Sequence, residues 1–159
     1  MNTTKPVVCI FPHYNKDEYI KSTGELLGFL KYTLPGELQG RYIIGHMGRT
    51  RKFEGKSLWE TVIKGSLILF SMQGRVWGAG FVRHGIEEIP KKDGKYKFII
   101  DFYPETIRSY DRGIAIRDIQ WVTGCDLTRG WLRASYLVLG YAHIIEQKLI
   151  GIMDIPERV

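Results

Sequence analysis

Residues Gly65–Val82 read GSLILFSMQGRVWGAGFV, and this stretch decides the fold. Ser66–Met72 is an apolar run of the length expected for a buried strand, and Gln73-Gly74 is a typical tight-turn pair. Arg75–Arg83 then predicts the returning strand of a β-hairpin. The two glycines of that returning strand leave one of its faces nearly bare, which often marks the close approach of a ligand or of another backbone.

Strands and helices are expected on both sides of this hairpin. Asn15 or Asp17 is the expected cap of a first helix that runs to Tyr32, and Leu34-Pro35-Gly36 is expected to stop it. The elements predict an α+β fold, in which a small, curled mixed β-sheet of five or six strands closes into a β-barrel and is flanked by helices. The other expected strands are Pro6–Phe11, Arg41–Met47, Lys95–Tyr103 and Gly113–Gln120, and the other expected helices are Ser57–Gly65 and Leu132–Leu149.

Length and composition place the chain among ordinary globular proteins. Its 159 residues are 44% hydrophobic and 25% charged, which fits one domain with a proper core and excludes disorder of the whole chain. No apolar run approaches the ~20 residues that a bilayer requires, and no signal peptide is visible, so we expect a cytoplasmic protein without a membrane partner. Cys9 and Cys125 stand far apart in the sequence, which favours neither a disulfide framework nor a metal site.

The chain carries a net charge of +6, and the distribution of its basic residues favours a nucleic-acid partner. One basic cluster lies between residues 49 and 56, and further arginines are interleaved with Tyr and Trp, as expected for a surface that contacts phosphates. The Lys-rich stretch 91–97 is interpreted instead as a solvated loop. The candidate phosphate ligands are Arg49, Arg51, Lys52, Lys56, Arg75, Arg108 and Arg112.

Nothing in the sequence indicates catalysis. Thr50–Ser57, TRKFEGKS, ends like a phosphate-binding loop, but Thr50 stands where the first glycine belongs and Glu54 would repel phosphates. The four histidines show no metal-ligand spacing, and no distinctive Ser-His-Asp order is present. We therefore expect a binding module with no cofactor and no metal, in which any GTPase or nuclease activity would belong to another domain or subunit.

Aromatic residues make up 13% of the chain, and a few of them lie where a base could stack. Trp77 shares a strand face with Arg75, Trp121 directly follows a predicted strand, and Tyr103 borders a loop. Aromatic walls of this kind hold bases that have been extruded from a helix. The alternative for Trp77 is that it packs under a helix, and the sequence leaves both interpretations open.

The hairpin resembles the central hairpin of the PUA-like superfamily, specifically of its EVE and YTH branches. Leu69-Phe70-Ser71 matches the end of the first strand, Gly74 the turn, and Gly78-Ala79-Gly80 the return strand. The resemblance covers residues 40–150 of a single domain of residues 1–159, to which residues 1–36 add an N-terminal strand and helix. It implies a small β-barrel flanked by helices.

The YTH branch cages a methylated adenine between aromatic residues, which directs attention to a base-binding pocket. The stretch that matches the position of one cage tryptophan is Gly45-His46-Met47, which contains no tryptophan. Other residues must then supply the walls of the pocket. The candidate pocket residues are Trp77, Trp121, Tyr103, His46 and Met47.

Three functions are open on this basis. The resemblance implies a specificity module that flips a modified base of DNA, N6-methyladenine foremost, into an aromatic pocket. In modification-dependent restriction systems of the McrBC type such modules precede a GTP-driven motor, so the partners would be a downstream motor domain and a nuclease subunit. The second function is an RNA-binding PUA- or YTH-like domain that reads a modified or unstacked base. The third is an ASCH-like nucleoside hydrolase, which needs Lys, Thr and Glu to converge.

Overall fold

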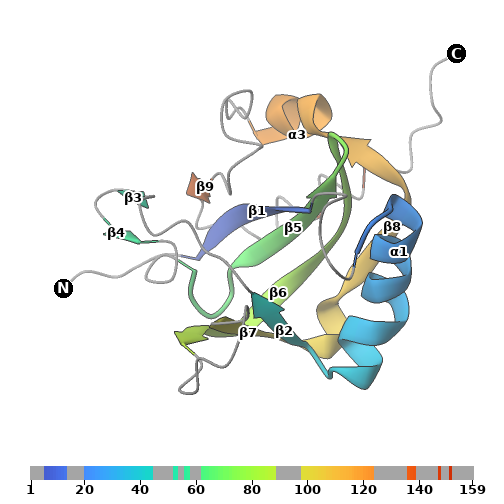
Figure 1. Cartoon of the computed structure of the whole chain (residues 1–159). Helices are drawn as coiled ribbons and strands as arrows, with labels where there is room; N and C mark the ends of the chain where they lie inside the picture. The colour runs from blue at the N-terminus through green and yellow to red at the C-terminus, as the bar shows by residue number, and fades with distance from the viewer. Residues whose placement is uncertain are drawn as a thin grey trace, which may run out of the picture.

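The computed structural model describes residues 6–13, 20–44, 52–53, 56–57, 62–88, 98–123 and 136–138, together with residues 147 and 151. Within them, seven strands form one mixed sheet with the order β2-β7-β6-β5-β1-β9, and β8 also pairs with β6 (Figure 1). The strands are β1 (Val7–His13), β2 (Arg41–Ile44), β3 (Lys52–Phe53), β4 (Lys56–Ser57), β5 (Leu67–Met72), β6 (Arg75–Glu88), β7 (Phe98–Phe102), β8 (Arg108–Ala115) and β9 (Tyr136–Val138). The helices are α1 (Thr23–Gly28), η1 (Phe29–Glu37), η2 (Pro104–Thr106) and α3 (Ile116–Thr123).

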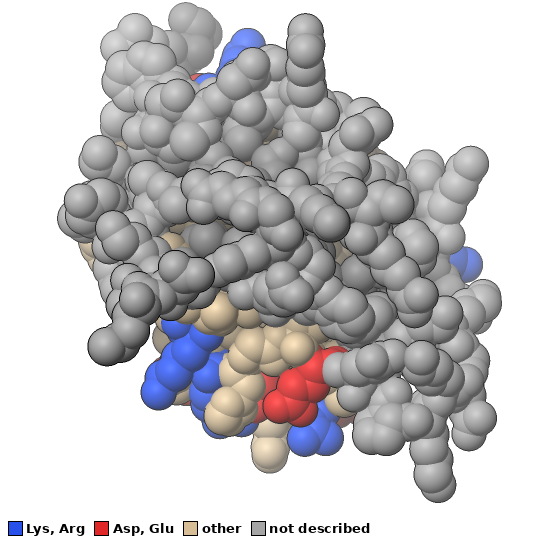
Figure 2. All heavy atoms as spheres, turned by 90° about the vertical axis from the view of Figure 1, so that its left-hand side faces the viewer, with Lys and Arg blue, Asp and Glu red and all other residues tan. Residues whose placement is uncertain are grey.

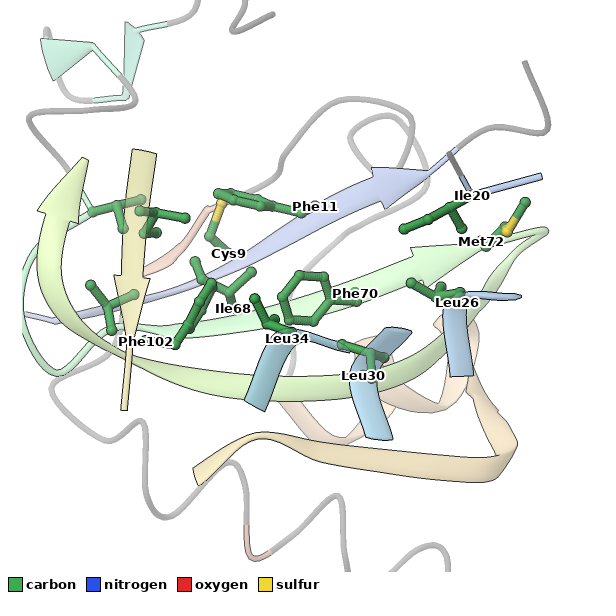
Figure 3. Packing of buried hydrophobic residues seen from close by; sticks show 13 residues of the cluster. Cys9, Phe11, Ile20, Leu26, Leu30, Leu34, Ile68, Phe70, Met72 and Phe102 are labelled. Atoms are coloured by element: carbon green, nitrogen blue, oxygen red, sulfur yellow. The ribbon is translucent and has the colours of Figure 1, made fainter. Parts of the chain in front are cut away.

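The predicted hairpin is confirmed as β5 and β6. Its turn residues Gln73 and Gly74 have φ values of 53° and 76°, the left-handed backbone that a tight hairpin turn requires. Every residue of β5 is buried, because both faces of the sheet are covered. β6 extends to Glu88, beyond the predicted end of the strand, and Figure 3 shows how strongly it bends along its length.

β6 is long enough to organise the whole sheet. β5 pairs with one edge of the first half of β6. On the opposite edge, β8 pairs with the first half of β6 and β7 pairs with its second half, and η2 joins these two strands. β1 adds to β5 in parallel, so the predicted N-terminal extension contributes a strand to the middle of the sheet. The mixed sheet with helices is therefore confirmed, and it is compatible with the α+β class.

The sheet is curled but not closed into the expected barrel. A barrel requires the two end strands of the sheet to pair with each other. In the described part of the chain the strand order begins at β2 and ends at β9, and these two strands do not pair.

The first helix begins later and ends later than predicted. Ser22, rather than Asn15 or Asp17, is its cap, and the Ser22 hydroxyl accepts a 3.1 Å hydrogen bond from the amide of Glu25. The helix continues as η1 through Pro35 to Glu37, with the wider π-type turns seen in the bond from Leu38 N–H to the Thr33 carbonyl, 2.8 Å. Pro35 does not stop the helix at this position.

Three further segments differ from the sequence predictions. Ser57 lies in β4 rather than at a helix start, and residues 62–66 form a turn that leads into β5. Residues 116–123 form α3 instead of continuing a strand, because the three-residue spacing of Ile116 and Ile119 buries both on one helical face. Residues 136–138 form β9, which pairs with β1, instead of belonging to a helix. A short apolar segment fits both helical and strand periodicity, and its packing partner decides between the two.

Two hydrophobic clusters lie on opposite faces of the sheet. Alternate residues of β5 supply them, with Ile68 and Phe70 on one face and Leu67 and Leu69 on the other. α1 and η1 cover the first cluster through their buried leucines, as Figure 3 shows. The buried residues that these two helices contribute are Leu26, Leu30 and Leu34.

Candidate functional site

A bulge in β8 shapes the surface that the described candidate arginines share. Val76 pairs with Ile114, and Gly78 pairs with Ser109. Between these two pairs β8 therefore advances by five positions while β6 advances by only two. The extra residues of β8 leave the regular pairing, and Gly113 among them adopts a φ of +67°. Such bulges bend a strand and redirect its side chains, and they are frequent beside functional sites.

Arg75 holds the bulge in place from the neighbouring strand. Its Nε donates a 3.2 Å hydrogen bond to the carbonyl of Arg112, and one Nη donates a 3.2 Å bond to the carbonyl of Gly113. A Cβ atom at position 113 would lie 3.0 Å from Arg75 Nε and 3.2 Å from the ring of Trp77. Only glycine therefore fits the bulge with these two side chains against it.

Trp77 is half-buried and braces the hairpin from which it projects. Its indole N–H donates a 2.9 Å hydrogen bond to the carbonyl of Met72, across the turn of the hairpin. The side chain packs against the cluster that contains Leu26 and Leu30 of the covering helix. This geometry favours the interpretation that Trp77 packs under a helix.

Among the other proposed walls of the base pocket, only the Tyr103 side chain lies within the described part of the chain, and it does not join Trp77. Tyr103 packs against the second cluster, on the opposite face of the sheet from the cluster that receives Trp77. Trp121 lies within α3 rather than just after a strand, and its side chain is not among those described. His46 and Met47 lie outside the described residues, as do Arg49 and Arg51 among the candidate phosphate ligands.

Three of the predicted phosphate ligands lie on β6 and β8. Arg108 and Arg112 are both exposed on β8, and Arg75 lies opposite Ala115 on the paired strand. Lys52 and Lys56 belong to the separate β3–β4 ribbon, and their side chains are outside the described set. The structure thus brings together the arginines of the bulge, from two strands that are distant in sequence.

The covering helix contributes two residues that the sequence analysis missed. Lys31 Nζ lies 2.7 Å from Asp111 Oδ1, which ties η1 to the bulge and raises the pKa of the Lys31 ammonium through a hydrogen bond and charge attraction. Tyr32, beside it, is 74% exposed, a large value for an aromatic side chain. The burial of Leu30 and Leu34 at helical spacing places Tyr32 on the outer side of the helix, a signal that the sequence contains.

A polar hollow at the opposite end of β6 also escaped the sequence analysis. Arg83 and Asp101 form an ion pair within it, with 2.7 Å between an Nη of Arg83 and Oδ2 of Asp101. The lower part of Figure 2, at the level of β2, β6 and β7 in Figure 1, shows basic and acidic side chains side by side among uncharged ones. No motif connects the residues of this hollow, which come from three distant segments.

The described side chains include no group of three or more His, Cys, Asp or Glu that could hold a metal ion. Across the ranges given above, no helix has both the length and the apolar character needed to span a membrane. No protein-family model matches the chain, and no curated protein matches it.

Proposed function

We propose that this chain is a nucleic-acid-binding domain whose β6–β8 bulge contacts the phosphate backbone. The observation that carries the proposal is the pair of exposed arginines, Arg108 and Arg112, on one strand whose backbone Arg75 holds in place. Bonds to two carbonyls order the bulge before any ligand arrives, which lowers the entropy cost of binding. The net charge of +6 favours the same class of partner.

Basic residues outnumber acidic ones among the described residues of the bulge. Asp111 is the acidic residue between the two exposed arginines, and Lys31 lies within ion-pair distance of it. That pair offsets its own charges, so Asp111 does not neutralise the arginines on either side of it. Arginine also binds phosphate oxygens in a bidentate manner, which makes it the favoured residue for this contact.

The finer proposal is a PUA-like specificity module of the EVE or YTH type. It rests on the hairpin sequence, and the mixed sheet is compatible with it. On this proposal the domain reads a methylated base in DNA, N6-methyladenine foremost, for a restriction system with a GTP-driven motor and a nuclease. An RNA-binding domain that reads an unstacked base is the alternative, and the exposed Tyr32 favours single strands because bases of any sequence stack on an aromatic ring.

The salt dependence of binding tests the phosphate contacts. The double variant Arg108→Ala/Arg112→Ala should flatten the plot of log affinity against log salt on duplex DNA by about 1.8, since each contact contributes roughly 0.9. Lys64→Ala is the matched control, because Lys64 is an exposed basic residue at the other end of the β5–β6 hairpin. A double variant with the slope of the unmodified protein would remove the bulge from the interface.

The same titrations distinguish the classes of nucleic acid. One duplex is compared with and without N6-methyladenine, and a single-stranded RNA of matched length is the third probe. A preference for the methylated duplex supports the restriction module, and a preference for RNA supports the alternative. Failure to bind any of the three at low salt would contradict the proposed function.

A further inference from the structure

The polar hollow has the size and chemistry of a site for one small neutral group. Its volume is about 260 Å³, below the roughly 300–1,000 Å³ that is typical of pockets for drug-sized ligands. It lies where η1 ends and β2 begins, against β6 and β7. The residues that line it are Glu37, Leu38, Gln39, Arg41, Arg83 and Asp101.

Backbone pairing fixes the floor of the hollow. Gly40, with a φ of +87°, accepts a 2.8 Å hydrogen bond from the amide of Phe102, and a side chain at position 40 would collide with the Phe102 carbonyl. Arg41 then pairs with Asp101 in the β2–β7 register. The floor of the site is therefore built on paired strands, which favours a preformed geometry.

A second irregularity, in β6, directs Arg83 towards Asp101. Val82 pairs with Phe102 and His84 with Asp101, so Arg83 is the extra residue on its strand. Its Nε and one Nη donate bonds of 3.1 and 2.7 Å to the same oxygen, Oδ2 of Asp101. Asp101 is only 19% exposed, and its Oδ1 makes no hydrogen bond to the described residues. One carboxylate oxygen is thus held in place by Arg83, while the other remains able to accept.

The balance of charge selects the kind of ligand. Arg41 and Arg83 are offset by Glu37 and Asp101, so the lining as a whole is neutral. A phosphate would be repelled by two carboxylates, and a metal ion by two guanidinium groups. A neutral group that carries both donors and acceptors fits the lining better. Among nucleobases, guanine offers two adjacent N–H donors for a carboxylate and the O6 and N7 acceptors that arginine prefers.

We propose that this hollow binds one unpaired guanine base, with Asp101 accepting from N1–H and the 2-amino group and Arg41 donating to O6 and N7. Arg83 acts as a positioning residue that holds the carboxylate. The proposal deepens the proposed function, on which it rests, by naming a base that the domain reads. It places the base site at the far end of β6 from the arginines of the bulge.

Nucleosides without phosphate test the hollow separately from the bulge. Calorimetric titration of the full chain should show guanosine binding, with inosine bound roughly tenfold more weakly because it lacks the 2-amino group. Adenosine should bind no better than inosine. Equal heats for guanosine, inosine and adenosine, or no saturable heat with guanosine, would overturn the proposal.

A substitution that changes preference keeps the test independent of folding. Asp101→Asn places an amide donor where Oδ1 would accept, because the two donors of Arg83 keep the remaining oxygen, so the variant should lose its preference for guanosine over inosine. Asp118→Asn, on α3, is the matched control and should bind guanosine like the unmodified protein. An Asp101→Asn variant that retains its preference for guanosine would refute the assignment.

Arg41→Gln supplies a second variant for the case in which Asp101→Asn does not fold. Arg41 is exposed, so its replacement should leave the melting temperature unchanged while weakening guanosine roughly tenfold. Undiminished affinity in this variant would also refute the site. If guanosine does not bind but the salt dependence on duplex DNA is intact, only this inference fails. Failure to bind both duplexes and the RNA contradicts the proposed function, whether or not guanosine binds.

Discussion

Replacing Trp77 with alanine tests whether this side chain supports the hairpin or forms the wall of a base pocket. Truncating a fully buried tryptophan costs ~3–5 kcal/mol. Trp77 is half-buried, so the packing loss should be about 2 kcal/mol, and loss of the hydrogen bond to the Met72 carbonyl adds about 1 kcal/mol. At ~2–4 °C per kcal/mol for a domain of this size, the melting temperature should fall by roughly 6–12 °C.

The assay combines thermal unfolding, followed by circular dichroism, with binding to methylated and unmethylated duplexes on the same samples. Trp77→Phe is the matched control, because it keeps most of the packing and removes the indole donor, and it should lose about 1 kcal/mol. A bracing role predicts that Trp77→Ala weakens both affinities in the same proportion. An unchanged melting temperature together with a selective loss of the methylated duplex would refute this reasoning and make Trp77 a base wall.

Three further substitutions probe the elements that position the sites. Gly113→Ala should destabilise the fold by at least ~1–2 kcal/mol, because alanine is strained at a φ of +67° and its Cβ would press on Arg75 and Trp77. A urea titration measures this loss, and an unchanged unfolding midpoint would mean that the bulge is not held as described. Ser22→Ala should cost about 1 kcal/mol by removing the helix cap, whereas Ser22→Asp should retain stability in the same titration. Burial raises the pKa of the Cys9 thiol above its ordinary value of 9.0, so the thiol stays protonated when folded and ionises in the unfolded chain. The contribution of this thiol to the free energy of unfolding should therefore be complete below pH 9.0 and decline above it by up to about 1.4 kcal/mol per pH unit. Cys9→Ala should abolish this decline, and a decline that persists in the variant would assign it to other groups.

Part of the candidate site was accessible from the sequence. The interleaving of arginine with aromatic residues directed attention to residues 108–112, which stay predicted phosphate ligands, and the glycines of the hairpin indicated close backbone approach. Gly78 meets that expectation, because a Cβ there would collide with the carbonyl of Arg108 on β8. The sequence did not show that Trp77 and Tyr103 pack on opposite faces of the sheet. Which face a residue occupies depends on strand register, and a bulge shifts that register.

The residues of the polar hollow also could not be grouped from the sequence alone. Arg41, Arg83 and Asp101 lie on three strands, and only the pairing of β2 with β7 and of β7 with β6 brings them together. An irregularity at Arg83 turns its side chain towards Asp101, and no local pattern predicts where a strand will be irregular. Tyr32 is an intermediate case, because helical spacing predicts its exposure, whereas the part of the surface on which it lies depends on how η1 packs on the sheet.

The sequence by itself determined the β5–β6 hairpin, because the apolar run Leu67–Met72 and the tight-turn pair Gln73-Gly74 act within a few residues. It also determined the positive charge. Only the tertiary structure decided that residues 116–123 become a helix and residues 136–138 a strand, and that β1 enters the sheet in parallel beside β5. In those segments the local preferences are nearly balanced, so burial against a distant partner, worth ~25 cal/mol per Å² of apolar surface, selects the conformation.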